Sequence, residues 1–344
     1  MAPGRKKPYV IPIFIPHSGC PHRCTFCNQH SVTGSRESLP DPEKLGAEIE
    51  QWLQYRSRDR GFTEISFYGG NFLGLEKGRI RRLLDEAAYW VSSGKVHGLR
   101  FSTRPDTVNP ETMSLIAGYP VTTVEIGVQS MDDRVLELLK RGHTSADSED
   151  AAHTLKKAGY RLGCQIMTGM PGESRDSALA TAGAVADLKP GFVRIYPLVV
   201  LSGSALAAEY RAGRFVPLEL QECIRRTASL YRVFERNLIP VIRMGLQSSN
   251  ELNTQGTILA GPYHQALGHM VFSHLMLQRA RRILDAVPWL PETVEMRVHP
   301  SSVSRMRGLK NANIRLLEST YPCVRRFLVR PDPDVAEDDV VISE

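Results

Sequence analysis

Strand-like and helix-like segments alternate along the first two hundred residues, and this alternation constrains the fold more than any other feature of the sequence. Short runs of apolar and β-branched residues predict strands at 9–16, 63–68, 99–103, 123–128, 162–167 and 192–200. Helical periodicity predicts helices at 42–55, 77–90, 132–139, 146–158 and 174–188, and a short helix after Pro110. Because parallel neighbours need a crossover connection, repeated βαβ units predict a parallel sheet.

The last third of the sequence has a different pattern. Helices are predicted at 217–236 and 262–286, and strands at 241–246 and 294–299. A chain of 344 residues is long enough for a (β/α) barrel of about 250 residues followed by a smaller region. We therefore expect a barrel-type α/β core at 1–200, a C-terminal α+β extension at 201–330, and an acidic, mobile tail at 331–344.

Composition excludes two classes of protein. Hydrophobic residues make up 42% and charged residues 23% of the chain, as in folded globular proteins rather than disordered ones. No stretch approaches the roughly 20 apolar residues of a membrane-spanning helix. The apolar run near the N-terminus is interrupted by Pro12 and Pro16, and no small-residue cleavage site follows it. We therefore expect a cytoplasmic protein with no membrane association.

Polar and glycine-containing loops follow the predicted strands, and we expect a site where these loops converge. Their sequences are HSGCPHRC, YGGN, STRPD, GVQS and TGMPGES. In parallel α/β folds, the carboxyl ends of the strands meet at one edge, and sites form there.

Three of the six cysteines lie within eight residues, in the loop after the first predicted strand. Cys20, Cys24 and Cys27 have the spacing C-x3-C-x2-C, so their thiolates can hold one face of a metal centre. One alternative is a zinc site in which His17, His22 or His30 is the fourth ligand. The other is a 4Fe–4S cluster, because three cysteines would leave one of its irons open to another molecule.

This motif, with Phe26 just before its last cysteine, resembles the CxxxCxxC signature of radical S-adenosylmethionine (SAM) enzymes. The resemblance implies a partial (β/α)6 TIM-type barrel of the radical SAM kind. It also implies a 4Fe–4S cluster whose open iron binds SAM. In that family the cluster reductively cleaves SAM to methionine and a 5′-deoxyadenosyl radical, which abstracts hydrogen from the substrate.

Further motifs extend the resemblance over roughly residues 8–250. They are the Gly69-Gly70-Asn71 turn and the segments EIGVQS (125–130), LKRGHT (139–144) and MTGMPGE (167–173). These resemble motifs of the Elongator catalytic subunit and of oxygen-independent coproporphyrinogen oxidases. The resemblance implies that SAM contacts come from the turn and from further polar residues. It places Gln129 and Gln165 near the ribose, Arg141 near the carboxylate, and Ser102 and the Gly69-Gly70-Asn71 turn near the amino group. Phe26 belongs to the same set of implied cofactor-binding residues.

The segments STRPD (102–106) and RIYP (194–197) favour the Elongator-like branch, and the segment at 297–310 resembles a bacterial group of short Elongator-like proteins. The favoured function is therefore radical SAM modification of a tRNA base. An electron donor such as a flavodoxin or ferredoxin is implied. The chain has no room for the acetyltransferase domain of Elongator, which leaves the use of acetyl-CoA, the reaction and its catalytic residues open.

The charge distribution also favours an RNA partner. The net charge is +6, but residues 331–344 contain six acidic and no basic residues, so residues 1–330 carry 43 basic and 31 acidic residues, a net charge of +12. A basic stretch near the C-terminus has a spacing that suits phosphate contacts. Its RNA-binding candidates are Arg297, His299, Arg305, Arg307 and Lys310. The alternative interpretation is a solvated charged face.

Two other functions remain compatible with the sequence. One is radical SAM chemistry on a small molecule such as a tetrapyrrole, which would give no affinity for tRNA. The other is a non-catalytic, zinc-bearing RNA-binding module, which would contain a single zinc ion instead of iron and sulfide.

Overall fold

The structure is a computed structural model that describes residues 8–15, 18–28, 42–55, 61–247 and 249–343. The chain divides into two compact units. The first contains residues 1–219 and 230–263, and the second contains residues 220–229 and 264–344. Helix α9 (Leu220–Arg236) starts in the second unit and ends in the first.

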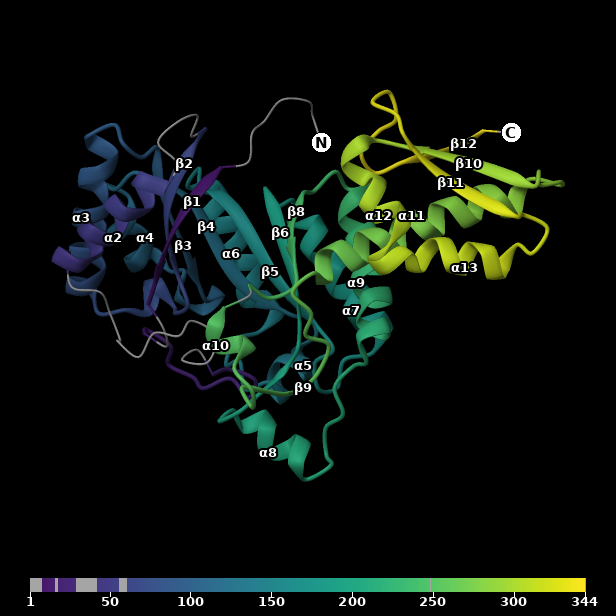
Figure 1. The fold of residues 1–344 in the computed structure, drawn as a ribbon. Helices are drawn as coiled ribbons and strands as arrows, with labels where there is room; N and C mark the ends of the chain where they lie inside the picture. The colour runs from purple at the N-terminus through teal and green to yellow at the C-terminus, as the bar shows by residue number, and fades with distance from the viewer. Residues whose placement is uncertain (1–7, 16–17, 29–41, 56–60, 248, 344) are drawn as a thin grey trace. The chain divides into compact units, whose positions relative to one another are not determined.

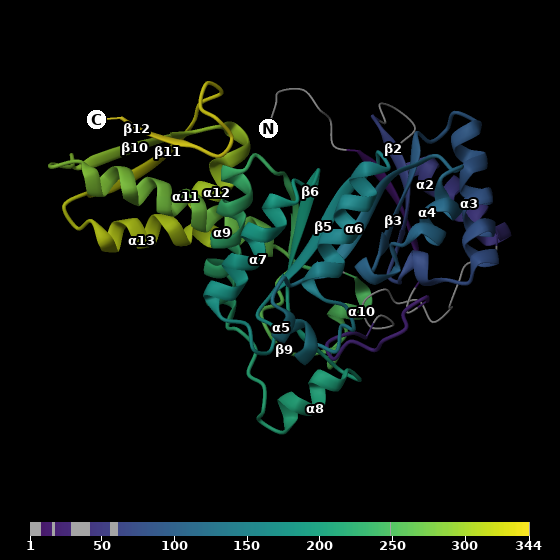
Figure 2. The same ribbon diagram turned by 180° about the vertical axis from the view of Figure 1, so that it is seen from behind.

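The first unit is built on a seven-stranded parallel sheet with the order β1-β2-β3-β4-β5-β6-β8. The sheet curls into a half-barrel, and α6 lies over β4 and β5 in the view of Figure 2. The strands are β1 (Tyr9–Phe14), β2 (Thr63–Tyr68), β3 (Gly98–Thr103), β4 (Val121–Gln129), β5 (Arg161–Thr168), β6 (Phe192–Pro197) and β8 (Val241–Met244).

Helices connect these strands, as Figure 1 shows. Capping boxes at Thr144 and Ser174 satisfy the first amides of α6 and α7, which explains why these helices begin there. The helices are α2 (Pro42–Tyr55), η1 (Phe72–Gly74), α3 (Lys77–Ser92), η2 (Pro105–Thr107), α4 (Pro110–Ile116), α5 (Asp133–Leu138), α6 (Ser145–Lys157), α7 (Arg175–Asp187), α8 (Ala205–Arg211) and α10 (Asn250–Asn253). A small antiparallel ribbon pairs β7 (Val200–Leu201) with β9 (Ile258–Ala260).

The two faces of the sheet have different side chains. Phe67 and Phe101 are in register on β2 and β3, and both stack on Phe72, with ring centroids 5.0 and 4.5 Å apart. Because neighbouring strand residues point to opposite faces, Arg100 and Ser102 lie on the other face, which lines the inside of the half-barrel. The apolar face packs against the helices, and the polar face is left for a site.

The predicted fold class is confirmed, with one correction to its boundaries. All six predicted strands form, but the strand expected in the C-terminal extension, β8, pairs in parallel with β6 as the seventh strand of the sheet. The first compact unit therefore continues to residue 263 instead of ending at 200. The local pattern of residues 241–246 predicts a strand, but it carries no information about which strand it pairs with.

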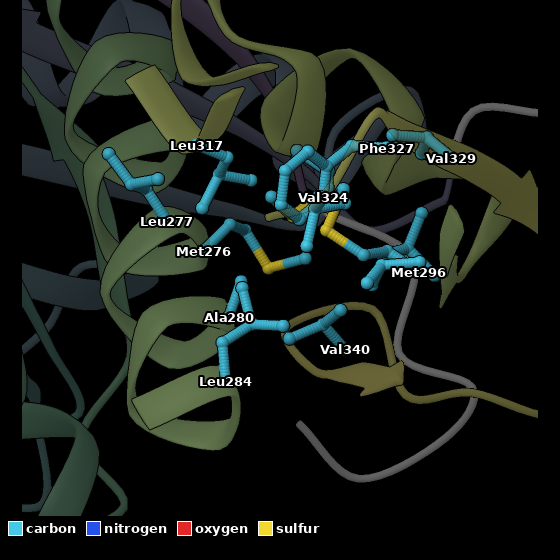
Figure 3. Close-up of a cluster of buried hydrophobic side chains, with 13 residues drawn as sticks. Met276, Leu277, Ala280, Leu284, Met296, Leu317, Val324, Phe327, Val329 and Val340 are labelled. Carbon is cyan, nitrogen blue, oxygen red and sulfur yellow. The ribbon is translucent and has the colours of Figure 1, made fainter. Parts of the chain in front are cut away.

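The second unit packs helices on a three-stranded sheet with the order β11-β10-β12. Met276, Ala280 and Leu284 of α11 pack against Met296 of β10 and Phe327 of β11, and all five are at least nine-tenths buried (Figure 3). The elements are α11 (Leu267–Ala286), β10 (Thr293–Val298), η3 (Pro300–Ser302), α12 (Val303–Arg307), η4 (Leu309–Asn311), α13 (Ala312–Thr320), β11 (Arg326–Pro331) and β12 (Val340–Ser343).

The acidic tail differs from the mobile segment that we expected. Its last strand, β12, pairs antiparallel with β10, with Val340 opposite Val298. Val340 is only 2% exposed, because its side chain completes the core of the second unit. The six acids dominate the composition of the tail and hide this short β-branched run. Among the described residues, no helix is long and apolar enough to cross a membrane.

Candidate active site at the carboxyl ends of the strands

Most of the predicted site residues lie at one edge of the half-barrel, at or beyond the carboxyl ends of its strands. The cysteine loop follows β1, the Gly69-Gly70-Asn71 turn follows β2, and Gln129 is the last residue of β4. Arg141 follows α5, and Gln165 lies on β5. The parallel sheet brings these segments together because every strand ends on the same side.

Asn71 fixes the cysteine loop to this edge. It is completely buried, and its Nδ2 donates to the carbonyl oxygen of Gly19 at 2.8 Å. Its Oδ1 accepts from Thr103 Oγ1 at 2.7 Å, Thr107 Oγ1 at 2.9 Å and the Arg104 amide at 3.0 Å. Both polar atoms of the Asn71 side chain therefore have partners inside the protein.

The glycines beside Asn71 serve close packing as well. A Cβ on Gly70 would lie 2.4 Å from the carbonyl oxygen of Ile15 and 2.7 Å from that of Ser18. A Cβ on Gly19 would lie 2.2 Å from the carbonyl oxygen of Asn71. Only glycine lets the cysteine loop and the turn after β2 approach this closely.

Arg141 connects the cysteine loop to β4. It is 6% exposed, and its Nη1 donates to Cys24 Sγ at 3.1 Å while its Nη2 donates to the carbonyl oxygen of Gly127 at 2.8 Å. Its own carbonyl oxygen accepts from Arg104, which forms a bidentate pair with Asp106. The Nε of Arg141 is buried and has no hydrogen-bond partner among the residues that the structure describes. A guanidinium with an unused donor therefore lies next to the cysteines.

His143, two residues further on, is a buried neutral imidazole. It is 5% exposed, and its Nε2 lies 3.3 Å from the carbonyl oxygen of Val128. Burial, and after it the positive charges of Arg141 and Arg104, lower the pKa of His143 to about 4.

The three cysteines share a loop, but their side chains do not converge. Cys20 is exposed, and Cys24 and Cys27 are partly exposed. Within the ranges that the structure describes, no three Cys, His, Asp or Glu side chains are close enough to hold a metal ion. Although Cys20 has accessible surface, desolvation by surrounding atoms and the nearby Cys24 raise its thiol pKa, against the opposing effect of Arg104 and Arg141.

Of the three candidate fourth zinc ligands, the structure describes only His22. His17 and His30 lie outside the described residues. The ring of His22 lies where a Cβ on Gly142 would be, 2.4 Å from that position.

Gln129 and Gln165 meet inside the half-barrel. Gln165 Nε2 donates to Gln129 Oε1 at 3.2 Å. A Cβ on Gly127 would lie 2.8 Å from Gln129 Nε2 and 3.4 Å from Arg141 Nη2, so Gly127 leaves room for both side chains. Gln129 has a φ of +65°, a left-handed backbone that ends β4 and turns the chain.

Phe26 and Ser102 have different surroundings. Phe26 packs against an apolar cluster that includes Val135 and Leu139, so it anchors the cysteine loop to α5 and to the residue that follows it. Ser102 is partly exposed on β3, in register with Glu125 of β4, and lies on the inner face of the half-barrel.

The sequence analysis missed a buried charged network on the same inner face. Arg100 pairs with Glu125 at 2.6 Å and lies 3.6 Å from Glu64. Glu125 also pairs with Arg194 at 2.9 Å. The signal was present in the sequence, because charged residues inside otherwise apolar strands are uncommon and alternate with buried hydrophobic residues here.

The basic residues of the second unit form a smaller patch than predicted. Arg297 Nη1 pairs with Asp332 at 3.1 Å, and His299 Nδ1 lies 2.7 Å from Ser301 Oγ. The guanidinium of Arg305 lies 4.6 Å from the ring centroid of Phe272. These three side chains have internal partners. Arg307 and Lys310 are exposed and form no ion pair within the described part of the chain.

Comparisons with known proteins extend this description. The family model of the radical SAM superfamily matches residues 14–185, and that of the radical SAM C-terminal domain matches residues 190–276. An uncharacterized protein of Methanocaldococcus jannaschii is 30% identical over 253 residues, which are 69% of this chain and 74% of that protein.

A second curated relative and one solved structure are also similar to this chain. A tRNA uridine(34) acetyltransferase of Dehalococcoides mccartyi is 26% identical over 230 residues, which are 58% of this chain and 50% of that protein. The chain thus spans about half the length of such relatives. The solved structure of an archaeal Elp3 from Methanocaldococcus infernus superposes with a TM-score of 0.62 over 78% of this chain and 63% of that chain, at 24% identity. This structural similarity confirms the fold.

The superfamily model covers half of the chain, and the half-barrel carries the cysteine loop after its first strand, as that family requires. The chain belongs to the radical SAM superfamily.

Proposed function

We propose that this chain is a radical SAM enzyme that modifies a uridine base of tRNA. In this proposal Cys20, Cys24 and Cys27 hold a 4Fe–4S cluster, and SAM binds beside it at the edge of the half-barrel. Support comes from membership of the superfamily and from the similarity to proteins named tRNA uridine(34) acetyltransferases.

The donor set and its support fit such a cluster. Three thiols extend from one loop, which is fixed on one side by the Asn71–Gly19 hydrogen bond and on the other by that from the Thr25 amide to the Leu139 carbonyl at 3.0 Å. Thiolates are the ligands that iron–sulfur clusters require. When bound, the cluster supplies the electron that cleaves SAM to methionine and a 5′-deoxyadenosyl radical.

The position of Arg141 is the main structural observation that supports binding of SAM beside the cysteines. Its guanidinium lies against Cys24 and has no carboxylate partner within the described residues, so it is available to the carboxylate of SAM. In the same proposal Gln129 and Gln165 bind the ribose, and Ser102 lies near the amino group. Gly69 and Gly70 contribute through their backbone.

The partners belong to the proposal as well. Arg307 and Lys310 would contact the phosphates of tRNA, and a flavodoxin or ferredoxin would deliver the electron. The similarity to acetyltransferases concerns about half of their length, so we assign no acetyl transfer to this chain.

The test compares the modified nucleosides of tRNA from cells with the intact gene, without it, and with Cys24→Ala as its only copy. We expect one uridine-derived nucleoside to disappear in the second and third strains. Purified protein, reconstituted without oxygen, should contain iron and sulfide in near fourfold amounts. A single zinc ion with unchanged tRNA would instead indicate the non-catalytic module.

The small-molecule function remains the second candidate, because the heme chaperone HemW of Mycobacterium tuberculosis is 27% identical over 219 residues. It predicts identical tRNA nucleosides in all three strains and no binding of tRNA by the purified protein.

A further inference from the structure

The side chain of Arg194 crosses the inside of the half-barrel. It starts on β6, and its Nη2 donates to the hydroxyl of Tyr68 on β2 at 2.8 Å, 126 residues away in the sequence. Its Nη1 donates to the hydroxyl of Tyr196 at 3.1 Å, and its Nε lies 2.9 Å from Glu125 Oε2. One guanidinium thus holds two phenol oxygens and one carboxylate.

The charge of Arg194 is already balanced. Glu125 faces Arg194 with one oxygen and Arg100 with the other, and Arg100 also faces Glu64. Two carboxylates therefore share two guanidinium groups in a buried group without net charge. Arg194 has no positive charge left over for an anionic ligand, so its role is to hold the two tyrosines.

The two hydroxyls keep their protons for another partner. Each accepts a hydrogen bond from Arg194, which occupies a lone pair of the oxygen and leaves the O–H free to donate. Burial, and after it the carboxylate of Glu125, raise the pKa of Tyr68, so this phenol stays neutral and remains a donor. Both tyrosines are partly exposed on the inner face of the sheet, where Gln165 is in register with Arg194.

We infer that Tyr68 and Tyr196 are specificity-determining residues that bind two carbonyl oxygens of a flat, uncharged substrate group. Since one planar guanidinium fixes both hydroxyls, a planar ring with two carbonyl groups suits them. Uracil presents two carbonyl oxygens, whereas cytosine presents an amino group in place of one of them and would set a donor against a donor. The inference rests on the proposed function and assigns its recognition of uridine to these two hydroxyls.

The test measures the affinity of the reconstituted full-length protein for two stem–loop RNAs by fluorescence anisotropy. The RNAs differ only in having uridine or cytidine at the position that corresponds to uridine 34 of the relatives' substrate. Wild-type protein should prefer the uridine RNA. Tyr68→Phe and Tyr196→Phe should each reduce this preference about three- to tenfold, and the double variant should abolish it, because each removes one neutral hydrogen bond.

Matched variants distinguish an effect on recognition of the base from an effect on the folding of the protein. Tyr89→Phe removes the hydroxyl of a tyrosine that is 61% exposed on α3 and should leave both affinities unchanged. Arg194→Lys keeps a positive charge beside Glu125 but cannot hold both hydroxyls, so it should also reduce the preference. The ratio of the two affinities is decisive, because a merely structural role would weaken both RNAs equally.

Four results would overturn the inference. Equal weakening of both RNAs in Tyr68→Phe, or an unchanged preference in the double variant, rejects the role of the hydroxyls. Equal binding of both RNAs by wild-type protein rejects base recognition, while a tRNA modification that depends on Cys24 would leave the proposed function intact. Binding of neither RNA, together with unchanged tRNA nucleosides, rejects the proposed function and the inference together.

Discussion

Arg141 Nη1 donates a hydrogen bond to Cys24 Sγ at 3.1 Å, although the two residues are 117 positions apart in the sequence. The hydrogen bond from Nη2 to the Gly127 carbonyl at 2.8 Å orients the same guanidinium from β4. The cysteine loop and the end of β4 are therefore connected by one side chain that still has an unused donor, Nε.

Replacing Arg141 should weaken SAM binding more than it weakens binding of the cluster. A hydrogen bond between charged groups contributes about 1.5–3 kcal/mol, so Arg141→Gln should reduce the affinity for SAM roughly 10- to 100-fold. Equilibrium dialysis of SAM, with iron content measured on the same samples, checks this. Arg79→Gln, at an exposed position of α3, is the matched control. Unchanged SAM affinity in Arg141→Gln would reject the assigned role.

Substitution of Gly70 should disturb the packing between the turn after β2 and the cysteine loop. Because a Cβ would lie 2.4 Å from the carbonyl oxygen of Ile15, Gly70→Ala must push back the start of the cysteine loop. We expect a loss of about 1–3 kcal/mol in the free energy of unfolding, and lower iron content together with weaker SAM binding. Gly118→Ala is the control, because apart from Gly118 and its chain neighbours no atom of the described residues lies within 4 Å of its Cβ position. Normal iron content with selective loss of SAM binding would show instead that Gly70 only makes room for SAM.

Asn71→Ala should destabilise the protein, although the side chain of Asn71 has no contact with solvent. It leaves the Gly19 carbonyl and the Arg104 amide without this partner, whereas the Thr103 hydroxyl keeps its contacts with the Leu73 amide and Thr107 Oγ1. Each unsatisfied buried group costs about 1–3 kcal/mol, so the loss should exceed about 2 kcal/mol. Chemical denaturation measures it. Asn237→Ala, at the exposed end of α9, should change stability by less than about 0.5 kcal/mol.

The lowered pKa of His143 should make the stability of the protein depend on pH. Its pKa is about 4 in the folded protein and near 6.5 when unfolded, so the unfolded chain binds the proton more readily between these values. The free energy of unfolding therefore decreases as the pH falls from about 6.5 to about 4. This loss, which is caused by His143 alone, amounts to at most about 3 kcal/mol and is absent above a pH of about 7.

The corresponding measurement compares the free energy of unfolding of wild-type protein and of His143→Gln at pH values of about 7.5 and about 5, on either side of the unfolded pKa. Since carboxylates titrate in both proteins, the difference between the two isolates the histidine. The variant should lose less stability on acidification than wild-type protein does. Parallel pH profiles would show that His143 is protonated in the fold.

The secondary structure was largely predictable because its signals are local. Thr144 and Ser174 cap helices that the periodicity already predicts, and the β-branched runs form strands. Pairing is not local, so β8 was predicted as a strand but assigned to the wrong region. The strand at Val340 was missed because its few apolar residues follow a run of acids.

In the site, too, local motifs identify the residues, whereas their contacts join residues that are far apart in the sequence. The motifs identify the residues that gather at the strand ends, but the use of Asn71 depends on Gly19, 52 residues away. Arg100 and Glu125 are 25 residues apart, and only the pairing of their strands in the sheet brings the two side chains together. Distant contacts of this kind decide whether a residue faces a ligand or supports the fold.

The ion pairs of the second unit lead us to predict which of its basic residues contact tRNA. Arg307 and Lys310 are exposed without an ion pair in the described chain, whereas Arg297 is neutralised by Asp332. Charge reversal at both Arg307 and Lys310 should weaken tRNA binding. It should also reduce the slope of log affinity against log salt by about 0.7–0.9 for each phosphate that is no longer neutralised. Arg297→Ala should have a smaller effect, and Arg79→Glu on α3 none.

Asp332→Asn tests phosphate binding by the second unit through an expected gain of tRNA affinity instead of a loss. An amide in place of the carboxylate keeps the acceptor for the Asp334 amide, which donates to Oδ1 at 2.9 Å, but releases Arg297 from its ion pair. If phosphates bind this part of the second unit, freeing one more cation should tighten tRNA binding and steepen the slope by about 0.7–0.9. Affinities measured between roughly 50 and 200 mM salt, the range in which such slopes are resolved, distinguish the two directions. Identical slopes in wild-type protein, the double reversal and Asp332→Asn would place the tRNA elsewhere, because released counterions report only the phosphates that a cation neutralises.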